Sequence, residues 1–166
     1  VLTGMPGAGK STVGILLAKE LGYSFVDVDE YIIEKERAPL QEIINRRGEE
    51  YLIKIEKEEI YDLELKRRVV SPGGSIILYE DVMEYLRGKA LIVFLNNTFE
   101  NIQSRLTNAE LRGIVGLRDK TLERVYEERN PLYRKYADFT VDAGNKAPDE
   151  IVREISDYYS KENYTL

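Results

Sequence analysis

The segment from Gly4 to Ser11 restricts the possible folds of this chain more than any other. It reads GMPGAGKS and fits the pattern G-x-x-x-x-G-K-[ST]. Glycines let the backbone turn with positive φ, so that successive N–H groups can point inward and bind an anion. A short apolar segment precedes the loop, and residues 12–21 follow with helical periodicity, which would place the anion at the positive end of a helix. The sequence therefore predicts a phosphate-binding loop for a nucleoside triphosphate.

Each side chain of this loop has an expected task. Lys10 should place a cation on the β- and γ-phosphates and act in catalysis, and the Ser11 hydroxyl should bind Mg²⁺. ATP and Mg²⁺ are therefore the expected cofactors. A glycine-rich turn without a ligand is the structural alternative, and the Lys-Ser pair between a strand and a helix disfavours it. The residues expected to hold the nucleotide are Gly7, Ala8, Gly9, Lys10, Ser11 and Thr12.

Composition excludes several classes of site. The chain has 166 residues, no Cys and no His, so thiolate and imidazole chemistry are excluded and a metal must be a hard ion on oxygen ligands. Its net charge of −6 disfavours nucleic acid or a membrane surface as partner. No apolar run reaches membrane-spanning length, and no signal peptide is visible. We expect a cytoplasmic monomer with several residues preceding Val1.

Short apolar segments alternate with amphipathic ones along the whole chain. This order predicts a single α/β domain over residues 1–166, with a parallel sheet covered by helices on both faces. Strands are expected at 1–3, 24–27, 69–71, 91–95 and 138–142. Helices are expected at 12–21, 49–65, 99–106, 121–136 and from Pro148 to about Tyr158.

Two carboxylates, Asp27 and Asp29, end the second predicted strand. Open α/β sheets bind their ligands at the carboxyl ends of the strands, and alternate residues of a strand face the same way. One carboxylate could therefore bind water coordinated to Mg²⁺, while the other accepts a proton from an attacking hydroxyl. Alternatively, Asp29 only caps the helix that begins at YIIEKE.

Residues 107–119 have no steady hydrophobic period and contain two glycines and two arginines. We expect this segment to be a mobile lid over the site, because long irregular segments in compact domains are often functional. An ordinary surface loop is the alternative.

Five segments together resemble the shikimate kinases in order and spacing: GMPGAGKSTVG, FVDVD, GEEYLIKIE, the glycine pair in VVSPGGS, and ERNPLYRKYAD. The resemblance covers essentially the whole chain. It implies a P-loop fold like that of the nucleoside monophosphate kinases, in three layers. A five-stranded parallel sheet, a substrate-binding helical region at about residues 29–65 and a closing lid would belong to it. The implied reaction transfers the γ-phosphoryl group of ATP to the 3-hydroxyl of shikimate, in aromatic amino acid biosynthesis.

The resemblance also implies roles for individual residues. Asp29 corresponds to the base that binds the acceptor hydroxyls, and Asp27 to the residue that orders the Mg²⁺ shell through water. Arg129 corresponds to the arginine that binds the substrate carboxylate, although a surface ion pair would be an ordinary role for it. Arg112 resembles the catalytic lid arginine. The remaining implied positions are Gly73 and Gly74 against the substrate ring, and Arg105 and Pro148 around the adenine; Arg105 could otherwise be a solvated helix charge.

Three positions depart from the family pattern. Ile53 stands where the family has the second arginine of the carboxylate clamp, and Lys54 points about 100° further around the helix. Ser75 replaces the third glycine of a triplet, and the lid reads RGIV in place of R-P-L-L. The phosphate half of the site is thus intact and the acceptor half is altered.

Three functions remain open on the sequence alone. The first is a shikimate kinase with a divergent clamp, and the second is a related kinase for another hydroxy acid or an amino alcohol. The third is a nucleotide-binding module without turnover. A GTPase is disfavoured because Asn96-Asn97-Thr98 does not supply the N-K-x-D guanine signature. A nucleoside monophosphate kinase would agree with the expected fold, but the ERNPLY and D-x-D motifs resemble those of the shikimate kinases more.

Overall fold

The computed structural model describes residues 1–106 and 113–162. Its strands are β1 (Leu2–Thr3), β2 (Ser24–Asp27), β3 (Arg68–Ser71), β4 (Val93–Asn96) and β5 (Phe139–Asp142). Its helices are α1 (Lys10–Leu21), α2 (Val28–Glu36), α3 (Leu40–Arg47), α4 (Glu49–Asp62), the 3₁₀ helix η1 (Ile76–Leu78), α5 (Glu80–Arg87), α6 (Phe99–Arg105), α8 (Leu122–Tyr136) and α9 (Pro148–Lys161).

All strand pairs are parallel, but the strands form two ladders. One has the order β1-β4-β5 and the other joins β2 to β3, so the prediction of one five-stranded sheet is wrong. β1 lies beside β3 without a hydrogen-bonded ladder between them. The physical reason is the length of β1: Leu2 and Thr3 pair with Val93 and Phe94, and so short a strand offers few backbone groups to a second neighbour.

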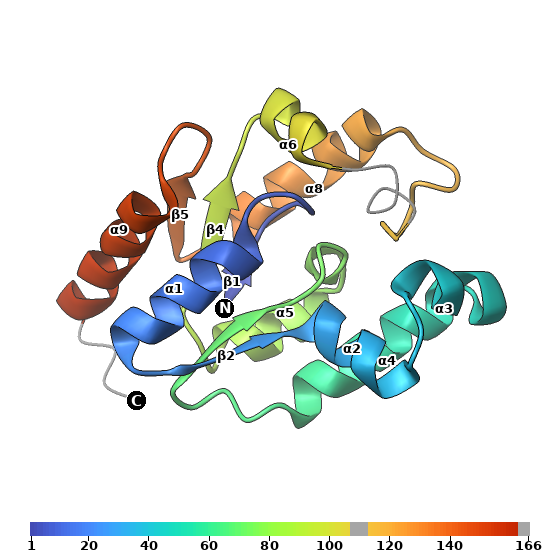
Figure 1. The fold of residues 1–166 in the computed structure, drawn as a ribbon, viewed down its shortest axis with the longest axis horizontal. Helices are drawn as coiled ribbons and strands as arrows, with labels where there is room; N and C mark the ends of the chain where they lie inside the picture. The colour runs from blue at the N-terminus through green and yellow to red at the C-terminus, as the bar shows by residue number, and fades with distance from the viewer. Residues whose placement is uncertain (107–112, 163–166) are drawn as a thin grey trace.

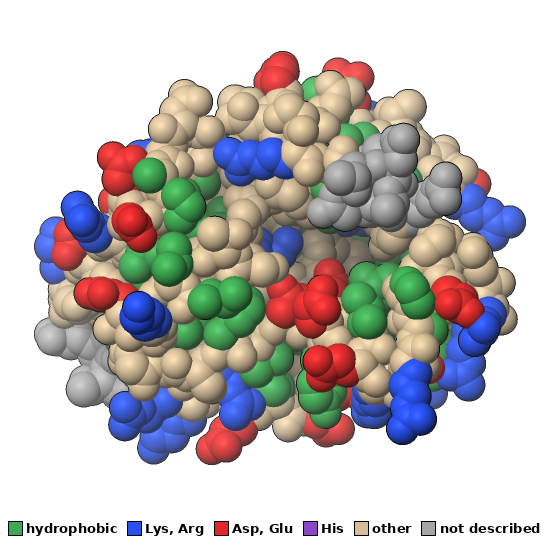
Figure 2. Space-filling view, viewed as in Figure 1, with side chains coloured by type: hydrophobic (Ala, Val, Ile, Leu, Met, Phe, Trp, Pro, Cys, Tyr) green, Lys and Arg blue, Asp and Glu red, His purple; other side chains and the backbone are tan. Residues whose placement is uncertain are grey.

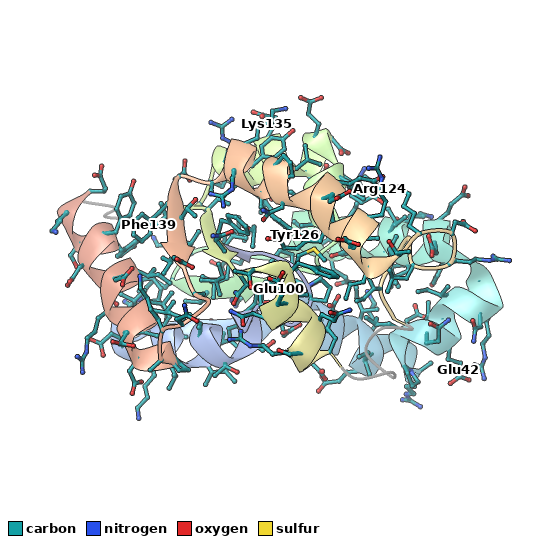
Figure 3. All side chains as sticks on the ribbon, turned by 90° about the horizontal axis from the view of Figure 1, so that it is seen from above. Glu42, Glu100, Arg124, Tyr126, Lys135 and Phe139 are labelled. Carbon is teal, nitrogen blue, oxygen red and sulfur yellow. The ribbon has the colours of Figure 1, made fainter. Side chains whose placement is uncertain are left out.

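Helices cover both faces of the strands, as the alternating pattern predicted. α1 packs against α9 and lies in front of the strands in Figure 1, while α8 and α5 lie behind them. The ring of Tyr133 on α8 stacks on Phe94 of β4 with centroids 5.1 Å apart. At the other end, Phe139 of β5 stacks on Tyr158 of α9 at 4.1 Å, and Figure 3 shows Phe139 beside that helix.

The buried core is centred on β4. Ile92, Phe94 and Leu95 are each at most 1% exposed, which agrees with the apolar run LIVFL as a strand buried on both faces. These side chains fix β4 between α1 and α8, and therefore fix the edge at which the chain leaves the strand at Asn96.

The three helices α2, α3 and α4 form the region between β2 and β3, and they project to one side of the strands in Figure 1. The predicted helix over residues 49–65 ends earlier, at Asp62. α3 and α5 were not among the predicted helices. α9 begins with Pro148 at its first position, as expected from the fixed φ of proline.

Within residues 1–106 and 113–162, no helix is long and apolar enough to cross a membrane.

Candidate active site

The loop before α1 has the backbone that its glycines predicted. Gly7 has φ +78° and Gly9 has φ +93°, and Gly9 is the last residue before α1 begins at Lys10. A Cβ at Gly7 would also come within 3.2 Å of the Leu106 side chain. L-residues rarely adopt this left-handed conformation, so only glycines let the loop turn directly into the helix.

Backbone carbonyl groups of the loop hold the side chain of Lys10 in place. Its Nζ donates to the carbonyl oxygens of Gly4 and Met5 at 3.1 and 3.3 Å. Burial lowers the pKa of Lys10, while the nearby carboxylates of Asp29 and Asp27 oppose that shift. In the described ranges no carboxylate lies within ion-pairing distance of Nζ, so the ammonium group is available for an anionic ligand.

Asp27 caps α2 and also reaches Ser11. Its Oδ1 accepts from the backbone N–H of Asp29 and Glu30 at 3.1 and 3.5 Å, and its Oδ2 accepts from the Ser11 hydroxyl at 2.5 Å. The helix cap is therefore Asp27, whereas the sequence had left open that Asp29 was the cap. The exposed Ser11–Asp27 pair offers the oxygen donors that Mg²⁺ prefers, beside the loop that would hold phosphates.

Asp29 lies in the first turn of α2, because β2 ends at Asp27 and the chain turns into a helix at Val28. The two carboxylates therefore do not share one strand face, and Asp29 reaches the site from the helix. Burial raises the pKa of Asp29 to about 6, and Lys10 acts against that rise. Asp29 is thus a half-buried carboxyl group next to the loop lysine.

Two cavities meet at the phosphate loop, and both are lined by Gly7, Lys10 and Ser11. One, of about 450 Å³, is the acceptor cavity; Asp27, Asp29, Glu56 and Arg129 also line it. The other, of about 440 Å³, is the nucleotide cavity, and it extends along the loop to Arg105 and Pro148. Figure 2 shows the molecule hollowed near its centre, with acidic side chains gathered at the rim and a basic one visible inside.

Arg129 is a buried cation of the acceptor cavity. It is 3% exposed, and its Nη2 donates to the carbonyl oxygen of Val115 at 2.6 Å. No carboxylate of the described residues lies within ion-pairing distance of its guanidinium. An arginine has five N–H donors, so this side chain can still bind an anion in the cavity.

Residues 113–119 are the described part of the predicted lid, and the first three of them line the acceptor cavity. Ile114 and Val115 are buried and line it, and the N–H of Gly116 donates to Glu49 of α4 at 3.2 Å. Arg112, the expected lid arginine, lies outside the described residues together with the rest of 107–112.

The turn after β3 brings its glycines close to other parts of the site. A Cβ at Gly74 would come within 2.8 Å of Pro6, and the Gly74 carbonyl accepts from the Tyr133 hydroxyl at 2.6 Å. Ser75, which replaces the third glycine of the family triplet, also lines the acceptor cavity, and its hydroxyl donates to Glu56 Oε2 at 3.0 Å.

The nucleotide cavity brings Arg105 and Pro148 together with the loop, as expected, and adds Lys146 to its lining. Arg105 is fixed by Asn97, whose Oδ1 accepts from Nη1 at 3.3 Å. Asn97 also donates to the Ala8 carbonyl and accepts the Tyr126 hydroxyl at its own carbonyl. Figure 3 shows Tyr126 on α8 near Glu100 of α6.

The isoleucine at the position of the missing clamp arginine is not among the residues that line the acceptor cavity, so a longer side chain would be needed to reach the cavity from there. Ile53 is half-buried, and among the described residues of α4 the cavity is lined by Leu52 and Glu56. Lys54 is largely exposed and pairs with Glu58 at 3.7 Å.

Two further basic residues are also engaged elsewhere. Arg46 pairs with Glu42, and Arg47 pairs with Glu36.

Sequence reasoning missed Glu56, Asn97 and Lys146. Glu56 had a readable signal, because it interrupts the buried stripe of Leu52 and Ile60 at a spacing of four residues, where an apolar residue is expected. Asn97 follows an apolar strand and gave no such signal beyond its position.

Among the described residues, no group of three or more acidic side chains could hold a metal by itself.

Comparisons with known proteins identify shikimate kinases as relatives of this chain. The sequence profile described as shikimate kinase matches residues 6–160. A shikimate kinase of Caldanaerobacter subterraneus subsp. tengcongensis is 33% identical over 164 residues, which cover 97% of this chain and 95% of the relative. The crystal structure of Aquifex aeolicus shikimate kinase matches with a TM-score of 0.84 and 31% identity, over 99% of this chain and 98% of that one. Shikimate kinase from Acinetobacter baumannii, solved in complex with shikimate, also gives 0.84, at 27% identity over 99% and 93% of the two chains.

These matches extend from the phosphate loop to the last helix, so they include every element that lines the two cavities. Because the profile covers most of the chain and the Caldanaerobacter relative is 33% identical over 95% of its own length, the chain belongs to the shikimate kinase family.

Proposed function

We propose that this protein transfers the γ-phosphoryl group of ATP to the 3-hydroxyl of shikimate. One observation carries the proposal: the acceptor cavity contains both a carboxyl group, Asp29, and a buried guanidinium without a carboxylate partner among the described residues, Arg129. The phosphate-loop lysine lines the same cavity. A hydroxy acid matches this arrangement, because its hydroxyl can bind Asp29 while its carboxylate binds Arg129.

The residues of the nucleotide cavity can each be assigned to a part of ATP or to Mg²⁺. The loop from Gly4 to Ser11 would hold the phosphates of ATP, and Arg105 with Pro148 would enclose the base. Ser11 and Asp27, the latter through water, would hold Mg²⁺, which bridges phosphate oxygens and neutralises their charge. Lys10, now on the carbonyls of Gly4 and Met5, would exchange these partners for phosphate oxygens.

On the acceptor side, Asp29 would accept the hydrogen bond of the reacting hydroxyl and take its proton late in the transfer. Phosphoryl transfer has a loose transition state, so orientation of the hydroxyl contributes more than early deprotonation. Gly73 and Gly74 leave room for the ring. The complex of the Acinetobacter baumannii enzyme with shikimate supports this substrate.

The test is ATP-dependent phosphorylation of a panel of hydroxylated acceptors, with ATP hydrolysis without acceptor as the blank. We expect shikimate to be phosphorylated with the highest kcat/KM, and Lys10→Ala to abolish that turnover. An exposed variant on the same helix, Lys19→Ala, is the matched control. Phosphorylation of another acceptor with no turnover of shikimate would contradict the proposal.

A related kinase for a different hydroxylated metabolite is the second candidate, and one observation favours it. Position 53 carries a half-buried isoleucine where a second cation would hold the substrate carboxylate. Within the panel, an acceptor with a smaller or differently placed charge would then be preferred. The proposals of a monomer and of a cytoplasmic location remain predictions.

A further inference from the structure

The carboxyl group of Glu56 is the buried acidic group of the acceptor cavity that the proposed mechanism does not use. Glu56 is 3% exposed and lines the cavity from α4. Its Oε2 accepts the hydroxyl of Ser75 at 3.0 Å, while its Oε1 has no hydrogen-bond partner among the described residues. A buried polar atom without a partner is costly, so Oε1 needs either a proton with an acceptor or a ligand.

Asp29 reaches the same place from α2. A Cβ built on Gly73 would lie 2.5 Å from Glu56 Oε1 and 2.8 Å from Asp29 Oδ1, so the two carboxyl groups converge over one glycine. Two carboxylates so placed repel each other, and one of them tends to keep its proton. No cation of the described residues forms an ion pair with Glu56.

The groups that face Glu56 from the surrounding elements set which carboxyl keeps the proton. Burial and the charge of Asp29 raise the pKa of Glu56 to about 8, against the hydrogen bonds of Ser75 and Gly73 and the charge of Arg129. Asp29 lies beside Lys10, whose positive charge favours the ionised form of the Asp29 carboxyl group. The other titratable groups that interact with Glu56 are Lys10, Tyr79 and Tyr133.

Of this pair Glu56 is therefore the group that keeps a proton more readily, because it is more deeply buried and no cation of the described residues pairs with it, whereas Asp29 is half-buried beside Lys10. Oε2 already accepts a hydrogen bond from Ser75, so Oε1 is the oxygen left to carry the proton. From there the O–H group can donate a hydrogen bond into the cavity. A neutral Glu56 can donate a hydrogen bond to an anionic substrate. An ionised Glu56 would instead add a third carboxylate to those of Asp29 and the substrate and would repel both.

We propose that Glu56 is a specificity-determining residue: it is protonated in the working enzyme and donates a hydrogen bond from Oε1 to an oxygen of the acceptor. This inference rests on the proposed function, because it requires a hydroxylated acid in this cavity. With isoleucine at position 53, the protonated carboxyl group is the second donor of the acceptor side beside Arg129.

The experiment compares the acceptor KM of three enzymes from about pH 6.5 to about pH 9.5. Glu56→Gln keeps a donor and cannot ionise, and Glu56→Met keeps the size but has neither donor nor charge. Glu58→Gln is the matched control, since Glu58 is exposed on the same helix and pairs only with Lys54 in the described part of the chain. Thermal unfolding at each pH verifies that the variants are folded.

We expect the KM of the unmodified enzyme for shikimate to rise above about pH 8, approaching tenfold for each further pH unit. Glu56→Gln should have a KM close to that of the unmodified enzyme at neutral pH and keep it at high pH. Glu56→Met should raise KM about three- to tenfold at every pH, the effect of one lost neutral hydrogen bond, without a pH trend. If Glu56→Gln raises KM as much as Glu56→Met, or the unmodified enzyme shows no rise, the proposal is wrong.

An infrared measurement without substrate separates this inference from the proposed function. The apoenzyme at neutral pH should show the C=O stretching band of a protonated carboxyl group, and Glu56→Gln should lack it while Glu58→Gln keeps it. Absence of the band from the unmodified protein would overturn the inference even if shikimate is phosphorylated. If shikimate is not phosphorylated but the band is present, the proposed function fails alone, and the KM series is repeated with the acceptor that the panel identifies.

Discussion

The nucleotide side and the acceptor side of this site differ in how their polar groups are satisfied. On the nucleotide side, Lys10 and Arg105 each have a hydrogen-bond partner supplied by backbone or amide oxygens. On the acceptor side, the buried carboxyl group of Glu56 and the half-buried one of Asp29 converge over Gly73, and one oxygen of Glu56 has no partner among the described residues. These two basic groups of the nucleotide side are thus satisfied within the protein, whereas the partner of the Glu56 oxygen on the acceptor side depends on protonation or on a ligand.

This difference predicts that the acceptor side dominates the pH dependence of stability. The pKa of Glu56 rises from 4.5 in the unfolded chain to about 8 in the fold, so between these values the folded state holds one more proton than the unfolded state. The free energy of unfolding of the unmodified protein should therefore fall as pH rises from about 4.5 to about 8. Glu56→Gln has no such proton to lose.

Relative to the unmodified protein, Glu56→Gln should gain on the order of several kcal/mol between about pH 5 and about pH 8, since one pKa unit corresponds to about 1.4 kcal/mol. Urea unfolding at both pH values measures the difference, with Glu58→Gln as control. An advantage of Glu56→Gln that is the same at both pH values would show that Glu56 does not titrate in this range.

On the nucleotide side, Lys10→Ala should lower kcat on the order of 10²-fold or more. The ammonium group stabilises the charge that develops on the transferred phosphoryl group, which is worth several kcal/mol in such sites. Steady-state kinetics with ATP and shikimate checks this, with Lys19→Ala as control. Undiminished turnover would remove the phosphate loop from the mechanism.

Asp27 and Asp29 lie between the nucleotide side and the acceptor side, and substitutions of the two should have different kinetic effects. Asp29→Asn should lower kcat on the order of 10²-fold and leave the affinity for ATP nearly unchanged, because Asp29 meets the acceptor hydroxyl. Asp27→Asn should instead raise the Mg²⁺ concentration needed for half-maximal rate, since Asp27 contacts Ser11. Initial rates at varied ATP and Mg²⁺ measure both, and the reverse pattern would refute the assignment.

A change at position 53 should make the acceptor side resemble the rest of the family. If shikimate is the substrate, its KM should be high, and Ile53→Arg should lower it about ten- to a hundredfold through one added charge-assisted contact of roughly 1.5–3 kcal/mol. Ile53→Leu is the matched control. If another molecule is the acceptor, Ile53→Arg should abolish its turnover by burying an unpaired charge.

A low-micromolar KM for shikimate in the unmodified protein would contradict both outcomes. Lys54, Arg46 and Arg47 would be poor substitutes in that case, because each is engaged by an acidic residue of α2, α3 or α4.

Local patterns predicted the helices and strands that carry a strong signal. Gly7 and Gly9 have the positive φ that a phosphate loop requires, and β4 is as buried as its apolar run indicated. These features depend on nearest neighbours along the chain, so they can be read from it. The division of the strands into two ladders could not, because it depends on how β1 and β3 lie beside each other.

The features of the site also divide into those that the sequence indicates and those that depend on the tertiary structure. The sequence by itself determined the phosphate loop and the closely spaced carboxylates Asp27 and Asp29, because the spacing of these residues reflects their chemistry, whereas Arg129 was indicated by the resemblance to the shikimate kinases alone. Only the tertiary structure decided that Asp27 caps α2, that Ser75 turns to Glu56, and that Glu56 meets Asp29 over Gly73. The reason is that the pKa and the partner of a buried carboxyl group are set by groups from other elements of the fold, and no pattern along α4 encodes which groups these are.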